Sequence, residues 1–223
     1  MTSSDSRPLP EELILLCAHP KHGRFRAPVS EFHHAVAGAV LAELLLAGAI
    51  TVEKRHITGY QPFGARDEVE AGVLARLEAK GKSRFRPVLD QAITRVPNPP
   101  GHRFHLDRLV AQGCYTVAEK RILGLPWRTH LLTRPELRQQ TADRVAATLL
   151  NPHPSDPRLT DPPGGGDRPS VERDRQLAGL IGVSGLEHRL YPGRSGAPVR
   201  RAVRKLAWDL PIPQAVRRVS SSN

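Results

Sequence analysis

The stretch at residues 9–52 constrains the fold more than any other part of this chain. Every residue from 35 to 42 is apolar or glycine, and this run lies in a predicted helix that starts after an N-cap at Ser30 and ends at Ala47. A helix that is apolar on all sides is normally buried at the centre of a protein, because no face of it suits water. We therefore predict a mainly α fold, a compact helical bundle built around this segment.

Amphipathic patterns in the rest of the chain predict helices that surround the central one, with one or two short β-hairpins. The first of the surrounding helices is expected to begin at Pro10. The others are expected at residues 68–79, 87–95, 104–112, 135–150, 171–181 and 197–210. The hairpins are expected at residues 50–58 and 115–132.

The length of 223 residues is enough for one substantial core. We expect a disordered N-terminus at residues 1–8, a single domain at 9–218 and a disordered tail at 219–223. Residues 151–168 are rich in Pro, Asp and Gly, and are expected to form a loop inside that domain.

The charge balance indicates an anionic partner. Lys and Arg number 33 against 22 Asp and Glu, a net charge of +11. Such an excess favours nucleic acid, an anionic membrane surface or a phosphorylated ligand, although the charge could also serve solubility alone. Aromatic residues make up only 4% of the chain, which argues against a base-stacking platform for single-stranded nucleic acid.

Motifs for catalysis, metals and cofactors are missing from the sequence. It contains no phosphate-binding loop, dinucleotide fingerprint or paired-cysteine metal pattern. His102 and His105 have a spacing that could hold a metal, but no carboxylate pattern accompanies them. We expect neither an enzyme, a metal site nor a cofactor.

Two features bear on location. Cys17 and Cys114 both lie in apolar context, as expected of free thiols in a reducing cytosol. No apolar run approaches the ~20 residues that span a bilayer. We expect a cytoplasmic protein that is peripheral to the inner face of the membrane.

The first candidate binding group is basic. Arg24 and Arg26 flank Phe25 between the first two predicted helices, so an extended backbone would put both guanidinium groups on one side. Arginine forks match phosphate oxygens, which makes an anionic headgroup site possible. The alternative is a solvated loop with Phe25 as a core anchor. His102 and Arg103 precede the predicted helix at 104–112, whose positive end favours phosphate, or they are simply solvated.

The second hairpin carries a mixed basic and apolar group. Its members are Lys120, Arg121, Leu123, Leu125 and Trp127. Basic residues beside an exposed Trp and Leu tip would form an interfacial membrane anchor or an oligomer contact, unless the apolar side chains pack inward. Further along, Arg200, Arg201, Arg204 and Lys205 share one face of a predicted helix that could track phosphates or merely face solvent.

Several blocks of the chain resemble the Golgi phosphoprotein 3 family. They are LPEELILL at residues 9–16, GRF at 23–25, GAVLAELLLAG at 38–48 and LVAQG at 109–113. The resemblance implies a mostly helical domain with a projecting hairpin, and an adaptor that binds membranes through phosphatidylinositol 4-phosphate. In eukaryotes such adaptors retain glycosyltransferases in the Golgi. The abundance of Arg, Ala and Pro resembles a high-GC bacterial member.

The family pocket carries over only in part. Where it has a Trp and an Arg in the first block, this chain has Pro28 and Ala37; where it has two Arg before the fifth helix, this chain has Pro99 and His102. We therefore expect a differently built headgroup site made of Arg24, Arg26, His102 and Arg103.

Two other functions remain open at this point. The predicted helix ending at Ala47, followed by a hairpin, resembles a winged-helix DNA-binding regulator. That helix is apolar, however, and has few groups to contact base edges. The other alternative is a scaffold that binds client proteins or a second copy of itself through the hairpin.

Overall fold

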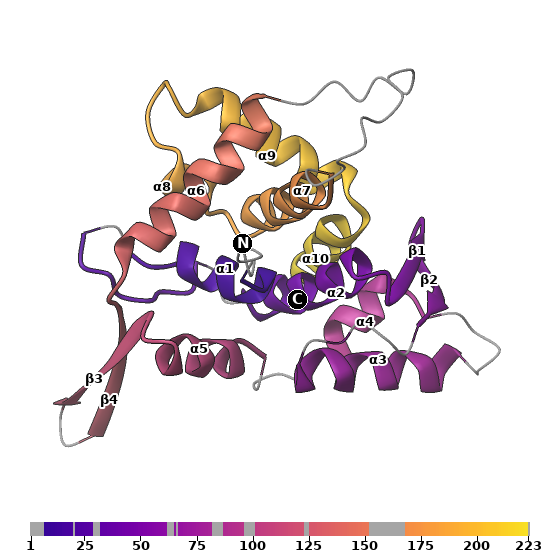
Figure 1. Cartoon of the computed structure of the whole chain (residues 1–223), viewed down its shortest axis with the longest axis horizontal. Helices are drawn as coiled ribbons and strands as arrows, with labels where there is room; N and C mark the ends of the chain where they lie inside the picture. Colours follow the sequence, from indigo (N-terminus) through magenta and orange to yellow (C-terminus); the bar gives the residue numbers. More distant parts are fainter. Residues whose placement is uncertain are drawn as a thin grey trace, which may run out of the picture.

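The computed structural model describes residues 7–19, 21–28, 32–61, 65, 67–81, 87–95, 101–122, 125–151 and 168–222. Within these ranges it confirms a mainly α architecture with two short hairpins (Figure 1). The helices are α1 (Leu9–Leu16), α2 (Phe32–Leu46), α3 (Glu68–Gly81), α4 (Leu89–Arg95), α5 (Gly101–Ala111), α6 (Pro135–Leu150), α7 (Arg168–Val183), α8 (Glu187–Leu190), α9 (Ala197–Asp209) and α10 (Pro211–Ser221). The strands are β1 (Ile50–Glu53), β2 (His56–Tyr60), β3 (Tyr115–Ile122) and β4 (Leu125–Leu132).

Helix α2 is the centre of the molecule, as its apolar sequence predicts. It packs against α1, α3, α4, α5, α7 and α10, and nearly all of its side chains are buried. Gly38 lets α10 and α7 approach, since a Cβ there would collide with Val216 and lie 3.2 Å from Leu180 Cδ2. A helix enclosed in this way cannot enter a DNA groove, so α2 is not the recognition helix that a winged-helix regulator would need.

Ion pairs connect α6 and α7 to the two central helices, α1 and α2. Arg173 in α7 contacts Glu43 in α2 at 2.7 Å, and Arg144 in α6 contacts Glu12 in α1 at 2.9 Å. Burial, the dominant cause, raises the pKa of Glu12 above its ordinary value, and the two arginines oppose that shift. The charged groups therefore tie four helices, α1, α2, α6 and α7, together.

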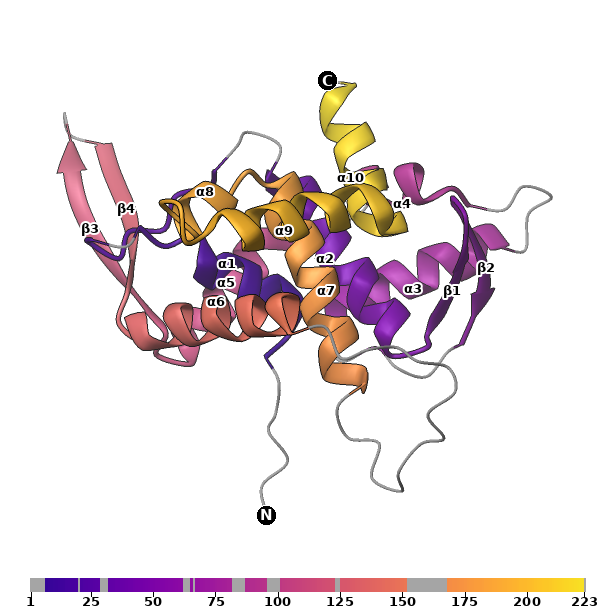
Figure 2. The same cartoon turned by 90° about the horizontal axis from the view of Figure 1, so that it is seen from above.

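The two hairpins differ in how they are held. β1 and β2 join through a turn in which Lys54 has a positive φ of 56°. β3 and β4 pair from Tyr115 opposite Leu132 to Ile122 opposite Leu125, and this ribbon projects from one end of the molecule (Figures 1 and 2). Its base is anchored by Tyr115, which is buried and donates a hydrogen bond from its hydroxyl to the carbonyl of Ile14.

Several helix boundaries differ from the sequence-based expectation, and two helices were not expected at all. α5 begins at Gly101, so His102 and Arg103 lie in its first turn instead of ahead of it. α8 and α10 were not expected. α10 continues to Ser221 where we predicted a disordered tail from residue 219, because Val219 belongs to an apolar helix face that is buried against the core.

Both cysteines, Cys17 and Cys114, are buried and free. In the described part of the chain, the model contains no helix with the length and apolarity needed to cross a membrane.

Candidate anionic-ligand surface

The segment between α1 and α2 is a tight turn fixed on the edge of β4. The amide of His19 donates to the Arg24 carbonyl, and the amide of Gly23 donates back to the His19 carbonyl, both at 2.8 Å. Two further bonds, from Phe25 to the His130 carbonyl and from Leu132 to the Gly23 carbonyl, attach the turn to β4. The turn is therefore held by backbone bonds and does not depend on the side chains that it displays.

Gly23 is needed at this turn. Its φ is +65°, and a Cβ on it would lie 3.0 Å from the carbonyl oxygen of Leu132. Any other residue would be strained in that backbone conformation and would press on the strand.

The predicted alternation of the basic loop is confirmed. Arg24 and Arg26 are exposed, whereas Phe25 is half-buried, with its ring 6.3 Å from Phe32 and 6.5 Å, edge-on, from Tyr115. Phe25 is thus the core anchor that the alternative interpretation required, and it also holds the two guanidinium groups outward. The packing of Phe25 is thus settled, and the headgroup site at Arg24 and Arg26 stays a prediction.

His102 and Arg103 lie in the first turn of α5, at its N-terminal end. His102 is half-buried, and burial, Arg103 and His33 together lower its pKa. Its Nδ1 is buried without a hydrogen-bond partner, whereas Arg103 is exposed. The N-terminal end of α5 adds a positive dipole to these two groups, so this end of the helix also favours an anion.

The backbone places the four predicted headgroup residues at two positions along α5, and whether they share a pocket stays a prediction. Gly23 bonds to Leu132, which pairs with Tyr115 just beyond the C-terminal end of α5. His102 is near the N-terminal end of the same helix, and a helix of this size is about 16 Å long. Arg24 and Arg26 therefore form one cationic position, and His102 and Arg103 form another.

The structure describes only part of the hairpin group. Leu123 lies outside the described residues, and the side chains of Lys120, Arg121, Leu125 and Trp127 are likewise outside what is described. The backbone pairing places Lys120 opposite Trp127 on the projecting ribbon. Whether these side chains form an anchor stays a prediction.

Sequence analysis missed two basic residues beside the turn. Arg138 in α6 and Arg189 in α8 are close enough to His19 that both lower its pKa, after the larger effects of burial and His22. A sequence signal existed for Arg138, which occupies the same helical face as the buried Thr141, Ala142 and Val145. An arginine at such a core-facing position is unusual and marks a site to examine.

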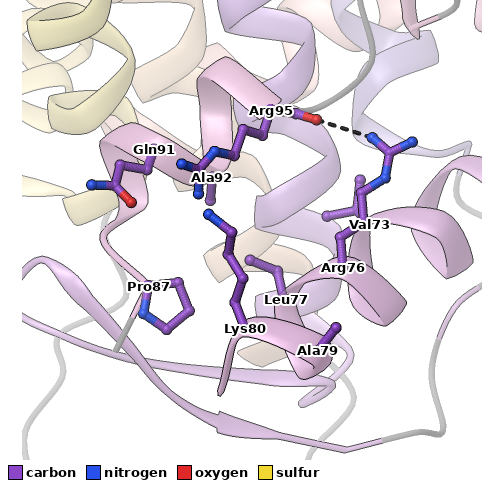
Figure 3. Close-up of a pocket in the computed structure, with 9 residues that line it drawn as sticks. All are labelled: Val73, Arg76, Leu77, Ala79, Lys80, Pro87, Gln91, Ala92 and Arg95. Carbon is purple, nitrogen blue, oxygen red and sulfur yellow. Dashed lines mark hydrogen bonds between the residues drawn. The ribbon is translucent and has the colours of Figure 1, made fainter. Parts of the chain in front are cut away.

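A separate cavity of about 280 Å³ lies between α3 and α4 (Figure 3). Its apolar lining includes Val73, Leu77 and Ala92, and Lys80 extends across it. Arg76 donates a hydrogen bond to the Arg95 carbonyl at 3.1 Å on one side. Its described lining includes none of the site residues that the sequence predicted.

His105, one of the two histidines considered for a metal, lies one turn after His102 in α5. His105 is fully buried, neither ring nitrogen has a hydrogen-bond partner, and burial, the main cause, lowers its pKa to about 4. Over the ranges that the structure describes, no group of three or more His, Cys, Asp or Glu residues could hold a metal ion.

Comparison with known proteins identifies the family of the chain. No curated protein matches it. The model of the Golgi phosphoprotein 3 (GPP34) family matches residues 9–222, which is nearly the whole sequence. This match covers the buried α1–α2 core, the basic turn and the projecting hairpin together. The chain therefore belongs to the Golgi phosphoprotein 3 (GPP34) family.

Proposed function

We propose that this protein is a peripheral membrane protein that binds anionic phospholipid headgroups and acts there as an adaptor. The observation that carries the proposal is the basic turn, which holds Arg24 and Arg26 outward on a rigid backbone beside the β3–β4 ribbon. Guanidinium groups fixed in this way can contact lipid phosphates without first losing backbone freedom.

Family membership supports the same function. The resemblance to the family gives phosphatidylinositol 4-phosphate as the expected lipid, with proteins retained at the membrane as the expected clients. The chain's cations at the turn and at the start of α5 suit two neighbouring lipids, because the two positions are separated along α5.

A second basic face competes with the turn as a membrane contact. Arg201 and Lys205 are exposed on α9, and Trp208 near its end is 61% exposed with Arg217 over its ring. Basic residues beside an exposed Trp are typical of membrane surfaces as well. The experiment must therefore separate the turn from α9.

The test is co-sedimentation with vesicles of phosphatidylcholine alone or mixed with phosphatidylglycerol. The paired change Arg24→Gln and Arg26→Gln should weaken binding to the anionic vesicles about tenfold or more, since each basic residue near the surface contributes roughly 1 kcal/mol. The control pair, Arg201→Gln and Lys205→Gln, removes the same charge from α9 and should leave binding nearly unchanged.

Equal binding to neutral and anionic vesicles would overturn the proposal, and so would an equal loss in both variant pairs. A further set of vesicles replaces phosphatidylglycerol with phosphatidylinositol 4-phosphate at matched total charge. Stronger binding to these vesicles supports the family's lipid, and equal binding indicates a site that recognises charge alone.

A further inference from the structure

Among the described residues, no anion pairs with the buried cation Arg138. It exposes only 8% of its surface, and its Nε is buried with no hydrogen-bond partner. No ion pair or hydrogen bond involves its side chain in the described structure. Burying an unpaired charge costs several kcal/mol, so a protein that keeps one in its native state needs a reason for it.

The groups around Arg138 cannot neutralise it. Those that act on it electrostatically are Arg189, Tyr115, Cys17 and Tyr191. Burial raises the pKa values of Cys17 and both tyrosines, so these groups are uncharged at neutral pH. Their hydrogens are also used elsewhere, because the two phenols donate to the carbonyls of Ile14 and Ala142.

Among the described groups that act electrostatically on Arg138, Arg189 is the one that is charged at neutral pH. Arg189 reaches over from α8, where its Nη2 donates to the Cys17 carbonyl at 3.3 Å. The stacked rings of His19 and His22, 3.8 Å apart, come from the basic turn. Figure 1 shows α8, the start of α6 and this turn at the end of the molecule that carries the β3–β4 ribbon.

Each of these two histidines can donate a hydrogen bond from its Nε2. His19 Nδ1 accepts from the amide of Lys21 at 3.2 Å, and His22 Nδ1 accepts from the amide of Arg24 at 3.4 Å. An imidazole that accepts at Nδ1 is neutral and carries its one hydrogen at Nε2. Each ring therefore keeps one donor for something other than the turn.

Acidic residues on the same elements point to other partners. Glu136 in α6 pairs with Arg134 at 3.0 Å, and Glu187 in α8 pairs with Arg204 at 3.4 Å. The cluster formed by His19, His22, Arg138 and Arg189 thus has donors from three separate parts of the chain and no described carboxylate among them.

We propose that this cluster is an anion site that takes a phosphate group, with the buried Arg138 guanidinium as its floor and Arg189 and His19 at its sides. The site is distinct from the N-terminal end of α5 and lies under the basic turn. A phosphate can accept bonds from several such donors at once. The phosphate could belong to a lipid headgroup or to a soluble molecule; only the lipid source rests on the proposed function.

The experiment follows thermal unfolding while inorganic phosphate replaces chloride at constant ionic strength. In the native chain the melting temperature should rise with phosphate and then saturate. Arg138→Met, which keeps the length of the side chain, should weaken the apparent phosphate affinity about tenfold or more. It should also raise the melting temperature without phosphate, because an unpaired buried charge is gone.

Two control variants keep the result interpretable. Arg201→Gln removes an exposed charge from α9 and should leave the phosphate response intact. Arg189→Gln should weaken the response while leaving the Arg138 floor in place, and it serves if Arg138→Met fails to fold. A native chain that responds to phosphate no more than to chloride overturns the site, as does a response that survives in both cluster variants.

Vesicle binding in the presence of phosphate separates the two sources. If free phosphate displaces the protein from anionic vesicles, the site takes a lipid headgroup; if phosphate stabilises the protein without displacing it, the site takes a soluble phosphate compound. Both outcomes support the site. Vesicle binding without any phosphate response overturns the site alone, and a phosphate response without vesicle binding overturns the proposed function alone.

Discussion

Two buried arginines differ in what surrounds them. Arg173 exposes 7% of its surface and Arg138 exposes 8%. Arg173 lies 2.7 Å from Glu43 and 3.8 Å from Glu12, so its charge is matched inside the protein. Arg138 has no such match among the described residues. The same side chain at the same burial is therefore structural in one place and available to a ligand in the other, and only the local charge decides which.

A prediction for single residues follows from the matched arginine. Arg173→Leu should destabilise the protein by about 3–5 kcal/mol, because it removes the buried cation that lies 2.7 Å from the Glu43 carboxylate. The measurement is urea unfolding at neutral pH. Arg175→Leu, two positions along α7, removes an exposed arginine whose contact with Glu172 is 3.7 Å, and it should cost less than ~1 kcal/mol. Similar losses in the two variants would contradict a structural role specific to Arg173.

Helices in this fold approach one another closely at small residues. Gly38 in α2 faces Val216 of α10, and Gly179 in α7 faces Pro213, where an added Cβ would lie 2.6 Å from Pro213 Cγ. Gly72 in α3 is also inside a helix, but a Cβ on it would meet nothing within 4 Å. Glycine in a helix costs conformational entropy. A close contact between helices offsets that cost at Gly38 and Gly179, and nothing described offsets it at Gly72.

These helix contacts give a paired prediction. Gly38→Ala should destabilise the protein by about 1–3 kcal/mol through overpacking of the α2–α10 contact. Gly72→Ala should instead stabilise it by about 0.5–1 kcal/mol, because alanine is the better helix former. Thermal unfolding of both variants checks the two signs. If both changes had the same sign, the close approach at Gly38 would not be what holds α10 against α2.

The docking of α10 also has a charged component. Arg218 donates two hydrogen bonds, of 2.7 and 3.0 Å, to the Asp90 carboxylate in α4, and Arg55 donates a third at 2.8 Å. The hydrogen bond from Arg218 is the largest cause that lowers the pKa of Asp90 below its ordinary value of 3.8. A depressed carboxylate pKa stabilises the folded state above the ordinary value, and that contribution is lost as the pH falls through the lower folded value.

Asp90→Asn should therefore lower the melting temperature at neutral pH, and the gap from the native chain should shrink as the pH falls below 3.8. Melting curves over that range test this dependence. Asp209→Asn changes an exposed aspartate at the end of α9 and should have little effect at any pH. A gap for Asp90→Asn that stays constant as the solution is acidified would contradict the ion-pair origin of the effect.

The molecule as a whole has a rigid centre and a projecting end. α2 is enclosed by six other helices, whereas the outer part of the β3–β4 ribbon pairs only with itself in the described structure. Backbone hydrogen bonds open most easily where few side chains pack over them. The same end carries the basic turn and the proposed anion site, so the loosely packed ribbon lies beside the more firmly held groups that would meet a membrane.

Hydrogen exchange measured by mass spectrometry should display this gradient. Amides near Glu119 and Arg128 on the ribbon should exchange by local opening, much faster than those of α2, which should exchange only on global unfolding. Anionic vesicles should slow exchange in the turn and ribbon and leave α2 unchanged. Equal protection of ribbon and α2 in the free protein would show that the ribbon is not a separate, loosely held unit.

Much of the fold could be predicted because its causes are local. The apolar run in α2 leaves no face for water, and the alternation at Arg24, Phe25 and Arg26 requires only an extended backbone. The family blocks also lie in these segments. Helix α10 was missed although Ile212, Ala215, Val216 and Val219 follow helical spacing, and it persists to Ser221 because Val219 is buried against the core.

The sequence by itself determined that an apolar central helix would be surrounded by amphipathic helices. It also determined that the chain would present basic groups on its surface. Only the tertiary structure decided which of those groups meet. It separated His102 from Arg24 along α5, and it brought Arg138 and Arg189 to the turn that carries His19. Periodicity fixes the face on which a side chain lies, but long-range packing of α6, α8 and the turn fixes its neighbours.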